Sequence, residues 1–268
     1  MIDLHSHLLP GIDDGAATLE ESVAIARAAA ADGISVLAAT PHVRDDYPTR
    51  AETMERLVAR LGEALRAAAV PLRVVTGGEL DLRHLRALDD DELRRFGLGG
   101  NRRYLLVEMP YAGWPLDLEA TVFDLGLRGF SCVVAHPERN HDVQARPERL
   151  GALVEAGSLV QLTAASVDGR LGRPCREAAF RLLDLGLAHM IASDAHGSSV
   201  RRVGMSRAAA AIGDEPLAHW LTVGVPGAIV RNDPLPRSPA RSRRGGRLAR
   251  VGRRLSGAGP EDARPAGH

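Results

Sequence analysis

Apolar segments typical of strands alternate with helical segments along most of this chain, and this alternation limits the possible folds more than any other feature. We expect strands at residues 2–4, 34–39, 72–76, 104–107, 131–135, 159–162 and 189–192. We expect helices at 18–31, 48–69, 89–96, 116–127, 147–156 and 173–185, with two more near 203–212 and 214–223. Such alternation predicts parallel strands joined by helical crossovers, and seven strands nearly complete an α/β barrel.

Five of the expected strands end directly in a His, Glu or Asp. Examples are Thr40-Pro41-His42, Gly77-Gly78-Glu79 and Ser193-Asp194-Ala195-His196. In barrels of parallel strands, catalytic groups lie at the carboxyl ends of the strands. A single polar residue at a strand end is ordinary, but this repetition predicts one shared site.

The first fifteen residues carry the densest group of candidates. His5 and His7 follow the strand at 2–4, and residues two apart in an extended chain point to the same side. Pro10, Gly11 and Gly15 then turn the chain, which brings Asp13 and Asp14 back towards the histidines. Spacing alone does not separate Asp13 from Asp14 as a ligand.

The full candidate set offers nitrogen and carboxylate oxygen without thiolate, which suits Mn, Fe or Zn. The candidates are His5, His7, Asp13 or Asp14, His42, Glu79, Glu108, His136, Asp194 and His196. Nine ligands exceed the needs of one ion, so two or three ions with a bridging carboxylate are expected. Clustered divalent ions generate hydroxide from water and stabilise both the attacking and the leaving oxygen of phosphoryl transfer.

Arg139 and Arg201 follow two of these strand ends, and each is able to bind a phosphate bidentately. Because all 34 cationic residues are arginine, a solvated surface role is an equal alternative for either one alone. The absence of lysine excludes a Schiff-base mechanism and a lysine-bearing phosphate loop.

A second phosphatase signature fails on physical grounds. Cys175 and Arg181 match the C-x5-R spacing of cysteine-dependent tyrosine phosphatases. That loop needs glycines, whose backbone N–H groups cradle phosphate, whereas the residues here are helix formers that place Cys and Arg on roughly opposed faces.

Composition changes at Asp233. Residues 233–268 contain nine Arg and three acids, a net charge of +6, whereas residues 1–232 carry −6. We expect a domain at 1–232 followed by a disordered Arg/Pro-rich tail. With two cysteines, no apolar stretch of membrane-spanning length and no signal peptide, the protein is expected to be cytoplasmic.

Several of these motifs together resemble a known family. Asp-Leu-His5-Ser-His7, Thr-Pro-His42, Gly-Gly-Glu79, Ala-His136-Pro-Glu-Arg139 and Ser-Asp194-Ala-His196 resemble the PHP (polymerase and histidinol phosphatase) superfamily. The stretches from His7 to Gly15 and from His136 to Asn140 resemble the bacterial manganese-dependent protein tyrosine phosphatases of capsule and exopolysaccharide operons. The resemblance covers about residues 1–230.

The resemblance implies a distorted (β/α)7 barrel with up to three ions, Mn2+ in the first instance and Fe, Zn, Co or Mg as alternatives. It assigns His5, His7, Glu79 and Asp194 to the first ion, Asp14, His42 and His196 to the second, and Glu79, Glu108 and His136 to the third. It places Arg139 and Arg201 as phosphate-binding residues, with His136 and Asp194 also in catalysis.

The implied activity is hydrolysis of phosphotyrosine, with the Tyr-rich tail of a tyrosine autokinase that controls polysaccharide export as substrate. A homo-oligomer and contact of the basic tail with a membrane surface are compatible with this, and no specific nucleic acid is expected. Alternatives are a small-molecule phosphatase of the histidinol phosphate type, a nuclease, or a non-catalytic adaptor that binds membranes or nucleic acid through the tail.

Overall fold

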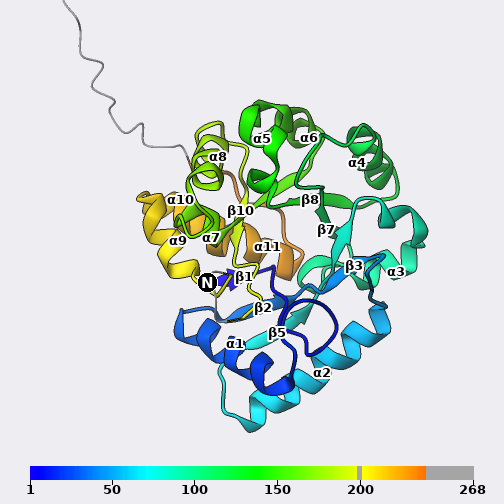
Figure 1. Ribbon diagram of the computed structural model, residues 1–268, viewed down its shortest axis with the longest axis vertical. Helices are drawn as coiled ribbons and strands as arrows, with labels where there is room; N and C mark the ends of the chain where they lie inside the picture. Colours follow the sequence, from blue (N-terminus) through cyan, green and yellow to red (C-terminus); the bar gives the residue numbers. More distant parts are fainter. Residues whose placement is uncertain (198–200, 240–268) are drawn as a thin grey trace, which may run out of the picture.

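The strands of the computed structural model, which describes residues 1–197 and 201–239, form two sheets (Figure 1). The smaller sheet has the order β1 (Ile2–Asp3), β2 (Val36–Ala39), β5 (Arg73–Thr76), and its strands are parallel. The larger sheet has the order β10 (Met190–Ala192), β9 (Leu159–Thr163), β8 (Ser131–Ala135), β7 (Tyr104–Glu108), β6 (Glu79–Asp81), β3 (His42–Arg44), β4 (Tyr47–Pro48). Among the described strands, only the β3–β4 pair is antiparallel.

The two sheets are linked where the candidate site residues lie. β2 runs on into β3 and β5 into β6, so both sheets share two chain segments. At the other side, an isolated parallel bridge pairs Ser6 with Ala195, just beyond β1 and β10. The backbone N–H of His7 donates to the carbonyl of Ala195 at 2.9 Å, and that of Asp194 to the carbonyl of His5 at 2.8 Å.

Each region in which a strand was expected contains one, and the mixed α/β architecture with mostly parallel strands is confirmed. The strands β3, β4 and β6 were not expected, since His42 and Glu79 were placed at strand ends. The chain shifts between sheets at Gly77-Gly78, where side chains would not fit: a Cβ on Gly78 would lie 2.6 Å from the Phe96 ring.

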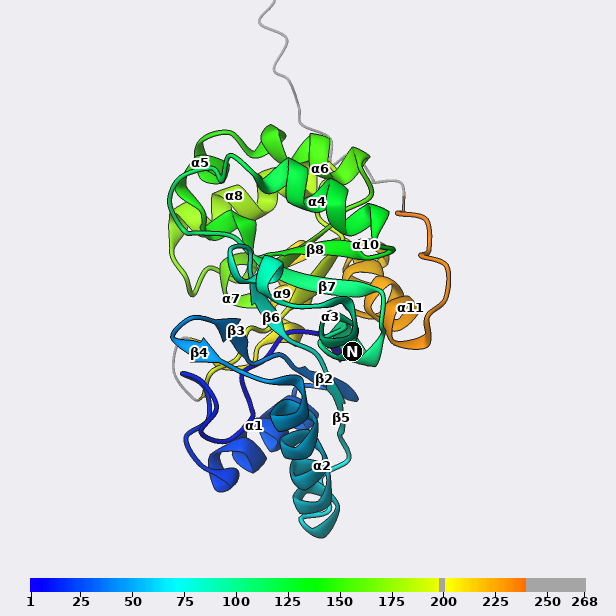
Figure 2. The same ribbon diagram turned by 90° about the vertical axis from the view of Figure 1, so that its right-hand side faces the viewer.

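The helices lie on the outside of the sheets (Figure 2). They are α1 (Leu19–Ala31), α2 (Ala51–Ala67), α3 (Asp90–Arg95), α4 (Leu118–Leu127), α5 (His141–Ala145), α6 (Gly151–Glu155), α7 (Ala164–Val167), α8 (Arg173–Asp184), α9 (Met205–Ile212), α10 (Glu215–His219) and α11 (Val225–Arg231). The Thr18 hydroxyl accepts from the N–H of Glu21 and caps α1, as its sequence predicts. α2 buries Met54, Leu57, Leu61 and Leu65. These residues recur at helical spacing and form one apolar face, which packs against the sheet.

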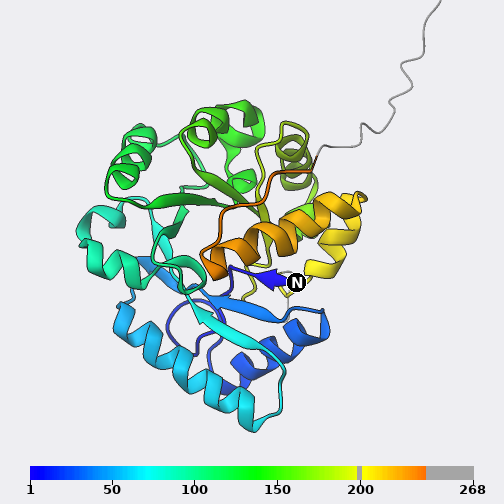
Figure 3. The ribbon, with the colours of Figure 1, turned by 180° about the vertical axis from the view of Figure 1, so that it is seen from behind.

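Four helical regions differ from expectation. α2 begins at Ala51 rather than Pro48, because Tyr47–Pro48 pairs with β3 instead. α5 and α7 are short and were not expected. The helix expected at 214–223 is α10 followed by a π-helical turn, Trp220–Gly224, which continues into α11 beside β1 (Figure 3).

Residues 233–239 remain in contact with the folded body. The Trp220 ring nitrogen Nε1 donates to the carbonyl of Pro236 at 3.0 Å, and the N–H of Asp233 donates to the carbonyl of Ala228 at 2.9 Å. The rest of the expected tail, 240–268, lies outside the described residues. Among the helices that the structure describes, none has the length and apolar character needed to cross a membrane.

Candidate metal centre

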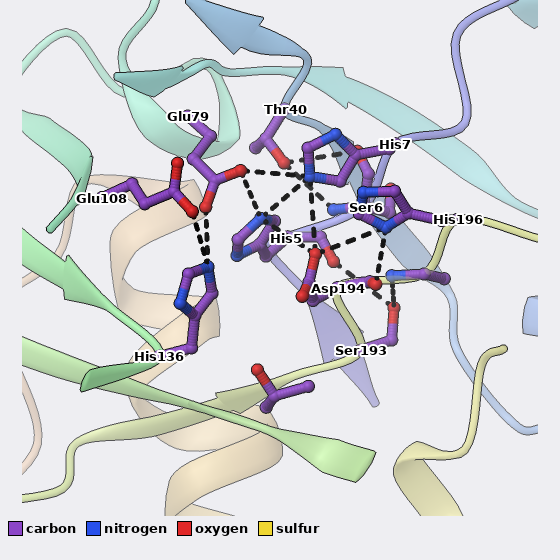
Figure 4. A network of polar contacts seen from close by, with 12 residues as sticks. His5, Ser6, His7, Thr40, Glu79, Glu108, His136, Ser193, Asp194 and His196 are labelled. Atoms are coloured by element: carbon purple, nitrogen blue, oxygen red, sulfur yellow. Dashed lines mark hydrogen bonds and ion pairs between the residues drawn. The ribbon is translucent and has the colours of Figure 1, made fainter. Parts of the chain in front are cut away.

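The candidate side chains converge from strands far apart in the sequence (Figure 4). His5 and His7 follow β1, His42 begins β3, Glu79 begins β6, Glu108 ends β7, His136 follows β8, and Asp194 and His196 follow β10. All are buried except His196, which is mostly buried, and the partly exposed Asp14. The shared site expected from the strand ends is therefore present as a geometric cluster.

The centre of the cluster holds four atoms with lone pairs. The Nε2 atoms of His5 and His7 lie 3.2 Å apart. Both lie close to Glu79 Oε2, at 3.3 and 3.2 Å, and to Asp194 Oδ1, at 3.5 and 3.4 Å. Such atoms repel one another unless a cation, either a proton or a metal ion, lies among them.

A second group lies on the solvent side of His7. Asp14 Oδ1 is 3.2 Å from His196 Nε2 and 3.4 Å from His42 Nε2. The other ring nitrogen of His196, Nδ1, lies 3.0 Å from the carbonyl oxygen of Asp194, to which it donates. His196 therefore turns Nε2 towards Asp14, and one ligand atom from each of these residues and His7 lies within 4.8 Å of the others.

A third group surrounds the other oxygen of Glu79. Glu79 Oε1 is 2.8 Å from His136 Nε2, and Glu108 Oε1 is 3.9 Å from the same nitrogen. His42 connects the groups, with Nδ1 3.0 Å from Glu79 Oε2. Glu79 is the carboxylate shared between the first and third groups, which is the geometry a bridging ligand needs.

Two opposing effects set the pKa values of the buried carboxyl groups: burial raises them, and neighbouring rings and arginines lower them. Burial opposes ionisation of Glu79, but His5, His136 and His42 outweigh it and hold the pKa of this carboxyl well below its usual range. Burial likewise opposes ionisation of Asp194, and His5, His7 and Arg201 hold its pKa well below the usual range. Burial and the neighbouring charge of Glu79 raise the pKa of Glu108. Two carboxylates are thus held ionised by the surrounding rings.

The residues present fit divalent metal ions. Glu79 Oε2, His42 Nδ1 and His196 Nε2 are buried and have no hydrogen-bond partner among the described residues, although other polar atoms lie 3.0–3.3 Å from each. Short approaches without hydrogen-bond geometry are expected where the atoms face a common cation. The donors are imidazole and carboxylate only, the set preferred by Mn, Fe and Zn.

The structure separates Asp13 from Asp14. Asp13 Oδ2 accepts from His7 Nδ1 at 2.8 Å and from the N–H of His42 at 3.1 Å, while Oδ1 accepts from the N–H of Gly15 at 3.0 Å. Asp14 instead faces His42 and His196. The carboxylate favoured by the family resemblance is the one that lies in the cluster.

Both candidate phosphate-binding arginines contact the same carboxylate. Arg139 Nη1 donates to Asp194 Oδ2 at 2.7 Å, and Arg201 Nη2 donates to Asp194 Oδ1 and Oδ2 at 3.0 and 3.2 Å. Arg44, which sequence reasoning missed, lies 3.5 Å from Glu108. Its position two residues after His42 in β3 could have identified it, because residues two apart in a strand point to the same face of the sheet.

The backbone is strained at two of the candidates. His136 has a φ of 32° and Asp194 a φ of 51°, in the left-handed region that few non-glycine residues adopt. Strain of this kind clusters at functional sites, where surrounding contacts hold it in place.

The excluded cysteine signature is helical, as its residues predict. Cys175 and Arg181 both lie within α8, so no phosphate-cradling loop joins them. Burial and the charge of Glu138 raise the pKa of the half-buried Cys175 thiol, which disfavours the nucleophilic thiolate.

Comparison with known proteins gives consistent matches. Residues 1–217 match the family model described as capsular polysaccharide synthesis, CpsB/CapC. The tyrosine-protein phosphatase YwqE of Bacillus subtilis is 36% identical over 203 residues, which cover 75% of this chain and 79% of YwqE. The putative tyrosine-protein phosphatase CapC of Staphylococcus aureus is 28% identical over 204 residues, with the same coverage of 75% and 79%.

A solved structure agrees with the sequence matches. It comes from work on YwqE from Bacillus subtilis and CpsB from Streptococcus pneumoniae, described as unique metal-dependent tyrosine phosphatases. It superimposes with a TM-score of 0.80 at 30% identity and covers 90% of this chain and 100% of its own.

Proposed function

Because the chain belongs to the capsular polysaccharide synthesis family CpsB/CapC, we propose that it is a metal-dependent phosphatase that hydrolyses phosphotyrosine in proteins. The observation that carries this proposal is the convergence of imidazole and carboxylate atoms in four overlapping groups, each able to hold a metal ion, with two arginines that contact Asp194. The relatives named tyrosine-protein phosphatases and the metal-dependent solved structure support it.

Three overlapping ligand groups are proposed. His5, His7, Glu79 and Asp194 hold the first ion, Asp14, His42 and His196 the second, and Glu79, Glu108 and His136 the third. The short distances within the first two groups, and between Glu79 and His136 in the third, support this division. We propose Mn2+ as the native metal, with Fe, Zn, Co or Mg as substitutes, since the donor set suits borderline and hard divalent ions. When bound, such ions make water nucleophilic at neutral pH and polarise phosphoryl oxygens.

Arg139 and Arg201 are proposed to hold the phosphate. Their guanidinium groups bind the Asp194 carboxylate, and a phosphate presents oxygens with the same spacing for a bidentate contact. His136 and Asp194 are also proposed to act in catalysis, as groups of the site that lie close to the leaving tyrosyl oxygen. Tyr111, whose ring lies 4.7 Å below the Arg139 guanidinium, backs that side chain against the site.

We extend the proposal to architecture and setting. The Ser6–Ala195 pairing supports one distorted (β/α)7 barrel at residues 1–232, with 233–268 as a separate basic tail. A tyrosine autokinase tail is the proposed physiological substrate, in the cytoplasm and in capsule or exopolysaccharide synthesis. Contact of the basic tail with an anionic membrane surface and a homo-oligomeric state remain parts of this proposal.

The test compares substrates on purified, Mn2+-loaded protein. We expect phosphotyrosine peptides to be hydrolysed with a higher kcat/KM than phosphoserine peptides or histidinol phosphate, and chelation to abolish turnover. Preference for histidinol phosphate would move the enzyme to small-molecule metabolism. Absence of phosphatase activity on all three substrates would contradict the proposed function.

A further inference from the structure

Each imidazole at the centre of the cluster, His5 and His7, uses its second nitrogen in a hydrogen bond to a side chain outside the cluster. His5 and His7 direct Nε2 towards Glu79 Oε2 and Asp194 Oδ1. Their Nδ1 atoms point the other way, towards Gln161 and Asp13. Which nitrogen carries the proton therefore depends on these two outer partners.

Asp13 accepts three hydrogen bonds and donates none. Besides Nδ1 of His7, it receives the backbone N–H groups of Gly15 and His42. A carboxylate has no proton to give, so His7 donates from Nδ1, and in the neutral ring the lone pair is then on Nε2. The same residue fixes the backbone of His42, so it holds two candidate ligands at once.

Gln161 plays the corresponding part for His5. It lies in the middle of β9, is fully buried, and places Oε1 2.9 Å from Nδ1 of His5. A glutamine amide is neutral, so it holds the ring by a hydrogen bond without adding charge to the cluster.

We propose that Asp13 and Gln161 are positioning residues that hold His7 and His5 as Nδ1–H tautomers, so that both Nε2 lone pairs face one metal ion. Neither residue touches the ion. Asp13 is thereby separated in role from its neighbour Asp14, which is a ligand. The inference rests on the metal site of the proposed function and adds the residues that preset it.

The first experiment measures binding of Mn2+ alone, by competition with a chelator and by the number of ions bound at saturation. We expect Asp13→Asn and Gln161→Leu each to weaken Mn2+ binding by about 10- to 100-fold while the saturating number is unchanged. Gln161→Glu, which keeps an acceptor for Nδ1–H, should restore affinity. Asp14→Asn should instead lower the number of ions bound.

Two variants serve as matched controls. Gln144→Leu removes the other glutamine, whose amide nitrogen donates to the carbonyl of Glu138, whereas Gln161 accepts from a ring nitrogen. Asp32→Asn alters a carboxylate that accepts from Ser206 at the surface. Both controls should bind Mn2+ as the wild type does.

The second experiment observes the tautomers directly in the wild-type protein and needs no substitution. In Zn2+-loaded protein labelled with 15N-histidine, the rings of His5 and His7 should carry their protons on Nδ1. Protons on Nε2, or folded Asp13 and Gln161 variants with wild-type affinity, would overturn the inference. If wild-type protein binds neither ion, the proposed metal site fails, and that result is distinguishable from failure of the positioning roles.

Discussion

Asp194 connects the imidazole rings of the site to the two candidate phosphate-binding arginines. It faces His5 and His7, accepts from Arg139 and Arg201, and adopts a φ of 51° at the end of β10. The surrounding cations hold its pKa well below the usual range. Loss of this carboxylate would leave two guanidinium groups and two rings without their common partner.

Glu79→Ala should be the most damaging change of a single ligand, because this carboxylate is shared by two of the proposed ions. We expect bound metal per chain to fall and phosphotyrosine hydrolysis to drop by more than the ~100-fold that loss of an outer-shell partner costs. Metal analysis and kinetics on the same preparation check this. Full metal content with normal turnover would remove Glu79 from the site.

Asp3 lies beneath the site and should make stability depend on pH. Burial raises its pKa to about 6, against hydrogen bonds from Ser193 and His5 that lower it. Between roughly pH 4 and pH 6 the folded chain holds a proton that the unfolded chain has lost, so this residue's contribution to stability falls as pH rises through that window.

Asp3→Asn should remove this fall in stability with rising pH, because the Asn side chain does not titrate. Its Oδ1 can still accept from the N–H groups of His5 and Ser193. Above pH 6 the variant should be more stable than the wild type by up to ~3 kcal/mol, and below pH 4 the difference should vanish. Thermal unfolding from pH 4 to pH 8 in chelator measures it. Parallel curves for the two proteins would show that Asp3 does not titrate in this range.

At the scale of elements, the strands were predictable and the breaks between them were not. Apolar runs such as Val36–Ala39 and Ser131–Ala135 predict strands from the local sequence alone, and both segments are strands in the structure. The shift from β5 to β6 depends on the fit of Gly78 against Phe96, which is a tertiary contact with no local pattern. Short helices such as α7 escaped notice for the same reason, because four residues show no period.

In the candidate site, too, some residues were predictable from the local sequence and others were not. Residues at strand ends, such as His136, were predictable from their place after an apolar run. Gln161 was not predictable, because it occupies an ordinary mid-strand position in β9. Only its contact with the ring of His5, 156 residues away in the sequence, indicates a role. The different contacts of Asp13 and Asp14 were not predictable either, because they depend on the three-dimensional course of the loop after His7.

The helix α8 provides a test of mechanism. Cys175→Ser should leave turnover within about twofold of wild type, because the thiol lies within the helix and its pKa is raised by burial. Chelation of the wild-type protein should abolish turnover, and Mn2+ should restore it. A folded Cys175→Ser protein without activity would favour a cysteine mechanism over the metal mechanism.

At the scale of the whole molecule, charge is divided between body and tail. Residues 240–268 carry eight Arg and two acids, whereas residues 1–232 carry a net charge of −6. Each basic residue near an anionic membrane contributes ~1 kcal/mol, and salt screens this attraction. Residues 233–239 contact Trp220 and α11, so a truncation that leaves the folded body intact removes residues 240–268 alone.

A chain ending at Pro239 should keep wild-type turnover on a phosphotyrosine peptide and lose salt-sensitive binding to vesicles rich in anionic lipid. The matched control is the full chain with Arg243, Arg244, Arg253 and Arg254 changed to Gln, which should also bind weakly. If the full-length protein ignores such vesicles at low salt, the membrane role of the tail is wrong and the catalytic proposal stands unaffected.

The span of the proposed ligand set along the chain, from His5 to His196, also sets the time at which a newly made molecule has all of its candidate ligands. During translation at ~5–20 residues per second, roughly 10–40 s pass between synthesis of the first and last ligands. A nascent chain that exposes only His5, His7 and Asp14 has no preset geometry, so affinity there follows the general order that favours copper and zinc. Selection by the complete proposed set of ligands therefore begins only after His196 has been made and the fold has brought these side chains together.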